Sequence, residues 1–107
     1  MPNQVKRYKV NTKITVYAWE VALFFERYKV RYFYDGAKTR TAETMVDVDG
    51  SLDVLCHIDA QNNTEWTIEM TFEDTTDPTR EIKPLKKTGK LVKNGIENVK
   101  FSHDLSK

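Results

Sequence analysis

The chain has 107 residues, of which 39% are hydrophobic and 11% aromatic, and it contains only four Gly and three Pro. This size and composition are typical of one folded domain with a single core, and they exclude a disordered or fibrous chain and a two-domain protein. The net charge is only +1, but residues 1–40 carry nine basic and three acidic residues, residues 41–79 ten acidic and no basic residues, and residues 80–107 eight basic and three acidic ones. Because an acidic centre can be neutralised by its basic flanks, we expect a self-complementary domain that binds neither nucleic acid nor membrane.

The N-terminus is polar and basic, without the apolar stretch of a secretory signal. The longest apolar-rich run, from Val16 to Phe25, is interrupted by Glu20 and is too short to span a bilayer. Cys56 is the only cysteine and so cannot form an intramolecular disulfide. We therefore expect a cytoplasmic protein.

Apolar side chains recur at every second position along most of the chain, which is the spacing of half-buried β-strands. The clearest sets, in chain order, are Tyr8–Val16, Arg27–Tyr34, Leu52–Ala60 and Thr64–Glu73. In every set the apolar residues occupy even-numbered positions. In Arg27–Tyr34 the tyrosines are expected to face inward, with Arg27, Lys29, Arg31 and Phe33 facing outward.

Weaker strand patterns and turn dipeptides complete the prediction. The weaker strands are Thr39–Val48, Arg80–Pro84, Lys90–Lys93 and Ile96–Ser102. The dipeptides that predict hairpin turns are Asp35-Gly36, Asp49-Gly50, Asn62-Asn63, Asp77-Pro78 and Asn94-Gly95. About seven or eight short strands at this spacing predict an all-β, mainly antiparallel two-sheet sandwich, with a small β-barrel as the alternative.

Residues 12–34 contain no Gly, Pro, Asn or Asp. Fully extended, this stretch would reach about 75 Å, far more than one strand spans, so the chain must bend within it. Ala18–Glu26 is the expected place for the bend. Its composition allows a short helical turn, and a bulged strand that crosses between sheets remains as the alternative.

The apolar segment before the basic strand predicts an interaction site. If the strand register of Tyr8 and Val10 continues, Trp19, Leu23 and Phe25 fall on the opposite face and remain exposed. Large apolar side chains of this kind dominate protein interfaces, and a symmetric homodimer is the first candidate. The alternative is that a sandwich covers both faces of the segment. The expected binding residues are Trp19, Leu23, Phe24 and Phe25 as apolar anchors, with Arg27, Lys29 and Arg31 as polar contacts.

Catalytic and metal sites are not expected. Cys56 and His57 are neighbours on one strand and should point to opposite faces, which prevents a thiol–imidazole pair. The segment Asp47–Asp53 has the acidic residues and glycine of a calcium loop, but the required end ligands are replaced by Met45 and Cys56. We therefore predict a non-enzymatic protein without metal or cofactor.

Two alternatives concern nucleic acid. The basic residues of 27–31, with the C-terminal lysines, could bind phosphates, although we expect the basic strand to pair with Glu65, Glu69 and Glu73. The acidic block could instead mimic a phosphate backbone and inhibit a DNA-binding enzyme. The lysines in question are Lys83, Lys86, Lys87, Lys90 and Lys93, and the block comprises Glu43, Asp47, Asp53, Asp59, Glu65, Glu69 and Glu73. The preferred prediction is a non-catalytic protein-interaction module of the accessory or inhibitor type, which binds a partner protein or a second copy of itself.

Overall fold

The computed structural model describes residues 5–26, 28–33, 38–91 and 95–105. Across these residues the chain forms strands and no helix, which confirms the all-β prediction. The strands are β1 (Lys6–Thr15), β2 (Glu20–Phe25), β3 (Tyr28–Phe33), β4 (Thr39–Val48), β5 (Ser51–Asp59), β6 (Glu65–Asp74), β7 (Leu85–Lys90) and β8 (Ile96–Asp104).

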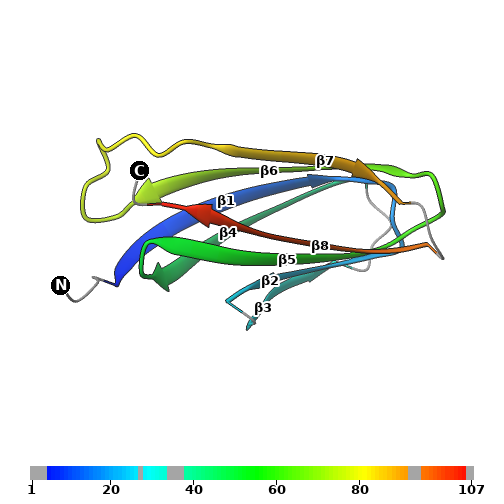
Figure 1. Cartoon of the computed structure of the whole chain (residues 1–107), viewed down its shortest axis with the longest axis horizontal. Helices are drawn as coiled ribbons and strands as arrows, with labels where there is room; N and C mark the ends of the chain where they lie inside the picture. The colour runs from blue at the N-terminus through cyan, green and yellow to red at the C-terminus, as the bar shows by residue number, and fades with distance from the viewer. Residues whose placement is uncertain (1–4, 27, 34–37, 92–94, 106–107) are drawn as a thin grey trace.

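The strands form two antiparallel sheets that pack face to face. Sheet A has the order β4-β1-β6-β7 and sheet B the order β3-β2-β5-β8. The sheets are not closed into a barrel, so the sandwich prediction is confirmed and the alternative is not (Figure 1). The molecule is elongated, with extents of 45 × 23 × 21 Å. Within the described ranges, no element is a helix of the length and apolar character needed to cross a membrane.

Even-numbered side chains of β1, β5 and β6 fill the core, as the alternation predicts. Tyr8, Leu52 and Ile68 are each at most 2% exposed. The registers place β1 beside β6 in sheet A, while β5 lies in sheet B. Apolar residues of both inner faces therefore meet between the sheets and hold them together.

Asp77-Pro78 lies in the connection between β6 and β7, which pair antiparallel in sheet A as predicted, but two other predicted turns do not form hairpins. Asp49-Gly50 joins β4 of sheet A to β5 of sheet B, and Asn62-Asn63 joins β5 to β6 of sheet A. Gly50 has a φ of 80° and Asn63 a φ of 70°, conformations that favour these residue types at any sharp reversal of the chain. The hairpin prediction is therefore wrong for both turns. Residue types that favour a turn indicate that the chain reverses there, but they do not indicate which sheet the next strand joins. The Asp35-Gly36 turn and Asn94 lie outside the described residues.

The bend between the first two strands contains no helical turn. The chain leaves sheet A after Thr15, crosses at residues 16–19 and enters sheet B as β2. It then reverses at Glu26, whose φ is 50°, into β3. The crossover breaks the alternation, so the core residues of β2 are the odd-numbered Val21, Leu23 and Phe25. The helical-turn prediction is wrong, and the segment is a strand that follows a crossing between sheets.

The facing of β3 also differs from the prediction. Tyr28 and Tyr32 are 78% and 47% exposed, whereas Phe33 is only 8% exposed. The register between β2 and β3 shifts at Leu23/Phe24, where a bulge changes which side chains share a face. β3 is also the edge strand of sheet B, so Tyr28 is less covered than a central residue.

The C-terminal third forms two strands where three segments were predicted. β7 begins after the predicted Arg80–Pro84 strand, where residues 80–84 are an irregular connection, and it shares only Lys90 with the predicted Lys90–Lys93 strand, of which residues 92 and 93 lie outside the described residues. Neither weak pattern had the alternation that identifies a strand. Ile96–Ser102 lies within β8.

Candidate interaction site

The structure separates the predicted binding residues. Leu23 and Phe25 are 0% and 3% exposed and lie in the core, so the prediction that they face outward is wrong. The cause is the change of alternation at the crossover. Trp19 is 56% exposed on that crossover, and Phe24 is half-buried on the outer face of β2. Lys29 and Arg31 are exposed on β3, and Arg27 lies outside the described residues.

A buried arginine holds the crossover in place. Arg40 is 3% exposed, and its guanidinium donates hydrogen bonds to the carbonyl oxygens of Val16 at 3.0 Å and Ala18 at 2.9 Å. The backbone N–H of Trp19 also donates to Asp59 O at 2.9 Å. Our sequence reading missed Arg40. Its even number in the predicted strand Thr39–Val48 was the available signal, because that parity places it on the inner face.

The clamped crossover displays two aromatic side chains. Tyr17 is 65% exposed and Trp19 is 56% exposed, and a hollow between them is also lined by Ala18, Gln61 and Thr64. Exposed aromatics on a fixed backbone are suited to contacts with a partner, because little freedom is lost on binding. The exposed aromatic side chains of the crossover are therefore suited to contacts with a partner protein.

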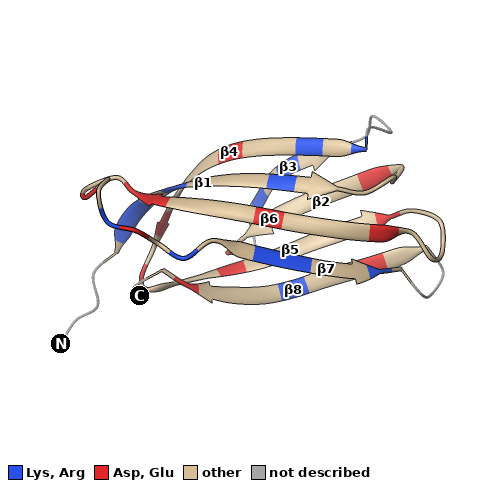
Figure 2. Ribbon diagram, turned by 90° about the horizontal axis from the view of Figure 1, so that it is seen from above, with Lys and Arg blue, Asp and Glu red and all other residues tan. Residues whose placement is uncertain are grey.

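The outer face of sheet A is covered by ion pairs. Arg7 Nε lies 2.9 Å from Asp47 Oδ1, and this hydrogen bond lowers the pKa of Asp47. Lys9 Nζ lies 3.6 Å from Glu43 and 3.5 Å from Glu73. The alternation of basic and acidic strands in this sheet is visible in Figure 2. This face is largely neutralised within the molecule.

These ion pairs correct one predicted pairing. The acidic strand β6 pairs with β1 and β7, where Lys86 Nζ lies 3.8 Å from Glu69. It does not pair with the basic strand β3, which belongs to sheet B. Self-neutralisation is present as expected, but it involves different strands because the charge blocks alone do not specify which strands become neighbours.

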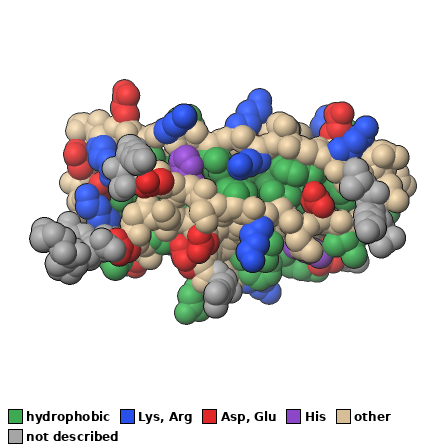
Figure 3. Space-filling model, in the orientation of Figure 1, with side chains coloured by type: hydrophobic (Ala, Val, Ile, Leu, Met, Phe, Trp, Pro, Cys, Tyr) green, Lys and Arg blue, Asp and Glu red, His purple; other side chains and the backbone are tan. Residues whose placement is uncertain are grey.

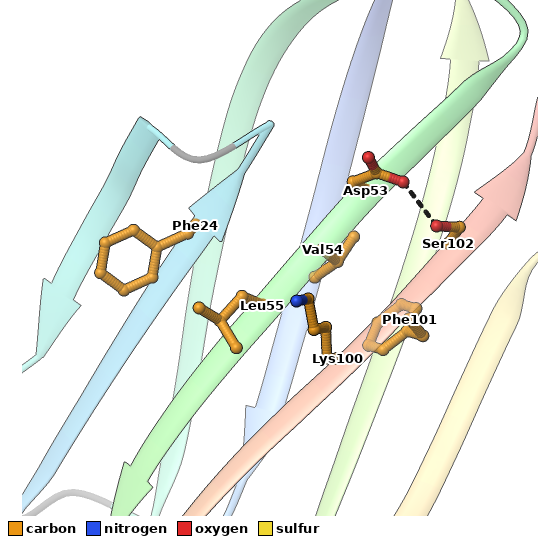
Figure 4. A pocket seen from close by; sticks show the side chains of 7 residues that line it. All are labelled: Phe24, Asp53, Val54, Leu55, Lys100, Phe101 and Ser102. Atoms are coloured by element: carbon orange, nitrogen blue, oxygen red, sulfur yellow. Dashed lines mark hydrogen bonds between the residues drawn. The ribbon is translucent and has the colours of Figure 1, made fainter.

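The outer face of sheet B has an apolar centre between two cations. The registers align Lys29, Phe24, Leu55 and Lys100 in one row across all four strands. Phe24 and Leu55 are half-buried, and both lysines are exposed. We call these four residues the sheet B row. Figure 4 shows Phe24, Leu55 and Lys100 projecting from three neighbouring strands.

A groove of about 670 Å³ lies along this face, between β2, β5 and β8. It is lined by Phe24, Asp53, Val54, Leu55, Lys100, Phe101 and Ser102. The next row across the sheet is Tyr32, Ala22, His57 and Asn98. Ala22 is only 5% exposed, so this row adds almost no accessible apolar surface next to the groove.

The acidic and basic groups of this face differ in their partners. Ser102 Oγ donates a hydrogen bond to Asp53, and Glu26 Oε1 accepts one from the backbone N–H of Asp53 at 2.9 Å. Lys29 and Lys100 form no ion pair with any residue of the described ranges, although Lys29 Nζ lies 5.5 Å from the centre of the Tyr32 ring. The cations are therefore available to an acidic partner, whereas these two acids already have internal contacts.

The residues considered as catalytic or metal-binding candidates do not come together in one site. Cys56 is buried, and His57 points to the outer face, where its Nδ1 lies 2.7 Å from Asn98 Oδ1. Burial raises the pKa of Cys56 to about 12. Asp47 and Asp53 belong to different sheets. In the part of the chain that the structure describes, no three His, Cys, Asp or Glu side chains are grouped as a metal site would require.

No protein-family model matches the chain, and neither the curated proteins nor the solved structures contain a match. The functional argument therefore depends on the geometry of the exposed surfaces.

Proposed function

We propose that the protein is a non-catalytic interaction module, of the accessory or inhibitor type, that binds a partner protein through the outer face of sheet B. The observation that carries this proposal is the sheet B row, in which Phe24 and Leu55 lie between Lys29 and Lys100. The other outer face is covered by internal ion pairs. A half-buried apolar pair beside cations that form no ion pair within the described residues is a surface to which a partner can bind.

The composition of the row suggests the chemistry of the partner. Burying a Phe or Leu side chain fully contributes about 1.5–3 kcal/mol, and part of this contribution is still available for the half-buried pair. Cations at the rim favour a partner that carries carboxylates there, which increases the rate and specificity of association. The partner is expected to present apolar side chains flanked by Asp or Glu.

The distribution of charge gives less support to the nucleic-acid alternatives. The basic strand β3 lies at one edge of sheet B, whereas Lys86, Lys87 and Lys90 lie on β7 at the opposite edge of sheet A. Of the other predicted lysines, Lys83 precedes β7 and Lys93 lies outside the described residues. The described cations form no single track for a phosphate backbone. On the acidic side, Glu43, Glu69 and Glu73 each have a lysine within 4 Å, which weakens their resemblance to a row of phosphates.

A random peptide library tests the proposal. The wild-type chain should enrich peptides that combine apolar residues with Asp or Glu. Replacing Phe24 and Leu55 together by Ser should weaken binding of the selected peptides by at least about tenfold, which corresponds to about 1.4 kcal/mol. Met45→Ser is the matched control, because Met45 is 50% exposed on the other outer face.

The charge of the peptides gives a second readout. Replacing Lys29 and Lys100 by Glu should change the selected peptides from acidic to basic. The proposal fails if the wild type enriches no peptides, or if the same peptides bind equally to the Phe24→Ser, Leu55→Ser variant.

A further inference from the structure

The sandwich has four edge strands, and they are not equally protected. β4 and β7 are the edges of sheet A, and β3 and β8 are the edges of sheet B. An edge strand presents unpaired backbone N–H and C=O groups that can pair with another chain. Proteins usually block such edges with short strands, lysines, bulges, inward-pointing charges or covering loops.

β3 and β7 carry several of these devices. Each strand has only six residues. β3 also contains Lys29 and Arg31, and its pairing with β2 is interrupted by a bulge. In β7, Lys87 points inward, with its Nζ 5.6 Å from the centre of the Phe101 ring on β8. Figure 3 shows apolar side chains between β7 and β8, with Lys and Arg side chains around them. Pairing at either edge is therefore disfavoured.

The end of β8 is covered by the connection between β6 and β7. Arg80 donates a hydrogen bond to the carbonyl oxygen of Leu105, directly after β8. His103 Nε2 lies 2.9 Å from Lys83 O, and the His103 ring stacks on Phe72 at 4.8 Å. These contacts restrict access to β8.

Among the described residues, β4 is the least protected edge: its one inward-pointing charge, Arg40, is held inside the molecule by hydrogen bonds to Val16 and Ala18. The strand spans ten residues without Pro, Gly or Lys, and its register with β1 runs from Thr15↔Thr39 to Lys6↔Val48 without a shift. Figure 2 shows β4 as the outermost strand on its side, with β3 set back from it. Met45 is 50% exposed, and Ala42 and Val46 are only partly buried. β4 therefore offers a long regular edge and unburied apolar surface.

We propose that a second copy of the chain pairs with β4 in antiparallel orientation, so that the two A sheets form one continuous sheet across a two-fold axis. The charges favour this occupant. Glu43 and Asp47 already contact Lys9 and Arg7, so a suitable strand places neutral residues opposite them. β4 does so itself when Thr44 lies on the axis, because Glu43 then faces Met45 of the second copy and Asp47 faces Thr41 of the second copy.

The same register suits the inner face. Ala42 then lies opposite Val46 of the second copy, which pairs a small with a larger side chain, and the two Thr44 side chains meet at the axis, where threonine pairs are favourable. A register with Glu43 on the axis would bring two carboxylates together and is disfavoured. Self-complementarity of this kind is what a two-fold interface requires.

Cysteine cross-linking tests both the interface and its register. Residues opposite one another in an antiparallel pair have Cα atoms about 4.5–5.5 Å apart, within the range of a disulfide. Thr44→Cys should therefore form a covalent dimer under mild oxidation. Ala42→Cys and Val46→Cys should each fail to do so, whereas the variant with both changes should cross-link. Cys56 is 0% exposed and should not contribute.

Sedimentation tests association without cross-linking. The wild type should show the mass of two chains as its concentration rises, and Thr44→Lys should sediment as one chain, because it places an ammonium group of each copy at the axis. Thr88→Lys adds the same charge to β7, the other edge of sheet A, and should remain dimeric. Circular dichroism spectra of both variants must match that of the wild type, which establishes that they are folded.

A wild-type chain that sediments as a monomer at every concentration overturns the proposal. So does a Thr44→Lys variant that is folded and dimeric. The sheet B row lies on the opposite face from sheet A, so Thr44→Lys should leave peptide binding unchanged. Failure of this proposal is therefore distinguishable from failure of the proposed function.

Discussion

Neighbouring residues on one strand experience opposite environments. Cys56 is 0% exposed between the sheets, while the adjacent His57 lies on the outer face beside Asn98. Burial disfavours the thiolate and raises the pKa of Cys56 to about 12. Because the thiolate is the reactive form of cysteine, this side chain is chemically protected in the folded state.

We expect the Cys56 thiol to be unreactive toward Ellman's reagent at pH 8 in native buffer and to react fully after unfolding in guanidinium. An exposed thiol introduced by Ser102→Cys, on the outer face of β8, is the control and should react at once in native buffer. Rapid stoichiometric labelling of the native wild type would contradict the burial of Cys56.

At the scale of elements, the crossover at residues 16–19 determines how β2 faces the core. Four residues outside any strand separate β1 from β2, and the alternation resumes with odd-numbered residues inside. Arg40 fixes this geometry, since its guanidinium satisfies two carbonyl oxygens of the crossover. The outward-facing, half-buried position of Phe24 and the burial of Leu23 therefore depend on a residue in a different sheet.

Arg40→Met should destabilise the protein by about 3 kcal/mol, because it removes two charge-assisted hydrogen bonds and leaves their acceptors without this donor. Urea unfolding measures the effect. Arg31→Met is the matched control, because Arg31 is exposed on an edge strand, and it should change the stability by no more than about 0.5 kcal/mol. Equal effects of the two changes on the free energy of unfolding would argue against a stabilising role for the hydrogen bonds of Arg40.

At the scale of the whole molecule, a polar cluster ties the two sheets together at the end opposite the crossover. Asp74 is 0% exposed at the end of β6, where Lys6 Nζ lies 3.6 Å and Arg80 Nη1 3.1 Å from its Oδ2. Arg80 also bonds to Leu105, which follows β8 of sheet B. Hydrogen bonds from Thr76, together with Arg80 and Lys6, lower the pKa of Asp74 from 3.8 to about 2.

This shift predicts a loss of stability in acid. Because the pKa of Asp74 is lower in the folded chain, its contribution is fully present above pH 3.8 and is lost as the pH falls toward 2. Thermal unfolding of the wild type between pH 5 and 2 should show this decline, and Asp74→Asn should be less stable at pH 7 and show a smaller decline. Asp49→Asn is an exposed control with the same change of charge, and a parallel decline in all three proteins would exclude Asp74 as the source.

The local pattern was sufficient for the strands and for part of the core. Trp66, Ile68 and Met70 alternate with polar residues, and this spacing alone places them on one face of β6. The pattern failed at β2 and β3, where a crossover and a bulge changed the alternation. Of the predicted binding residues, Trp19, Phe24, Lys29 and Arg31 lie at or near the surface, whereas Leu23 and Phe25 do not.

Period-two spacing and the charge blocks were enough to establish an all-β sandwich with internal charge neutralisation, because both depend on residues close together in the chain. They could not specify which strands become neighbours. Lys9 meets Glu43 and Glu73, and Leu55 meets Phe24, only because distant strands pair in the folded protein. The sheet B row and the open edge of β4 arise from this long-range pairing, which is selected by the packing of the whole core and is not encoded in any one segment.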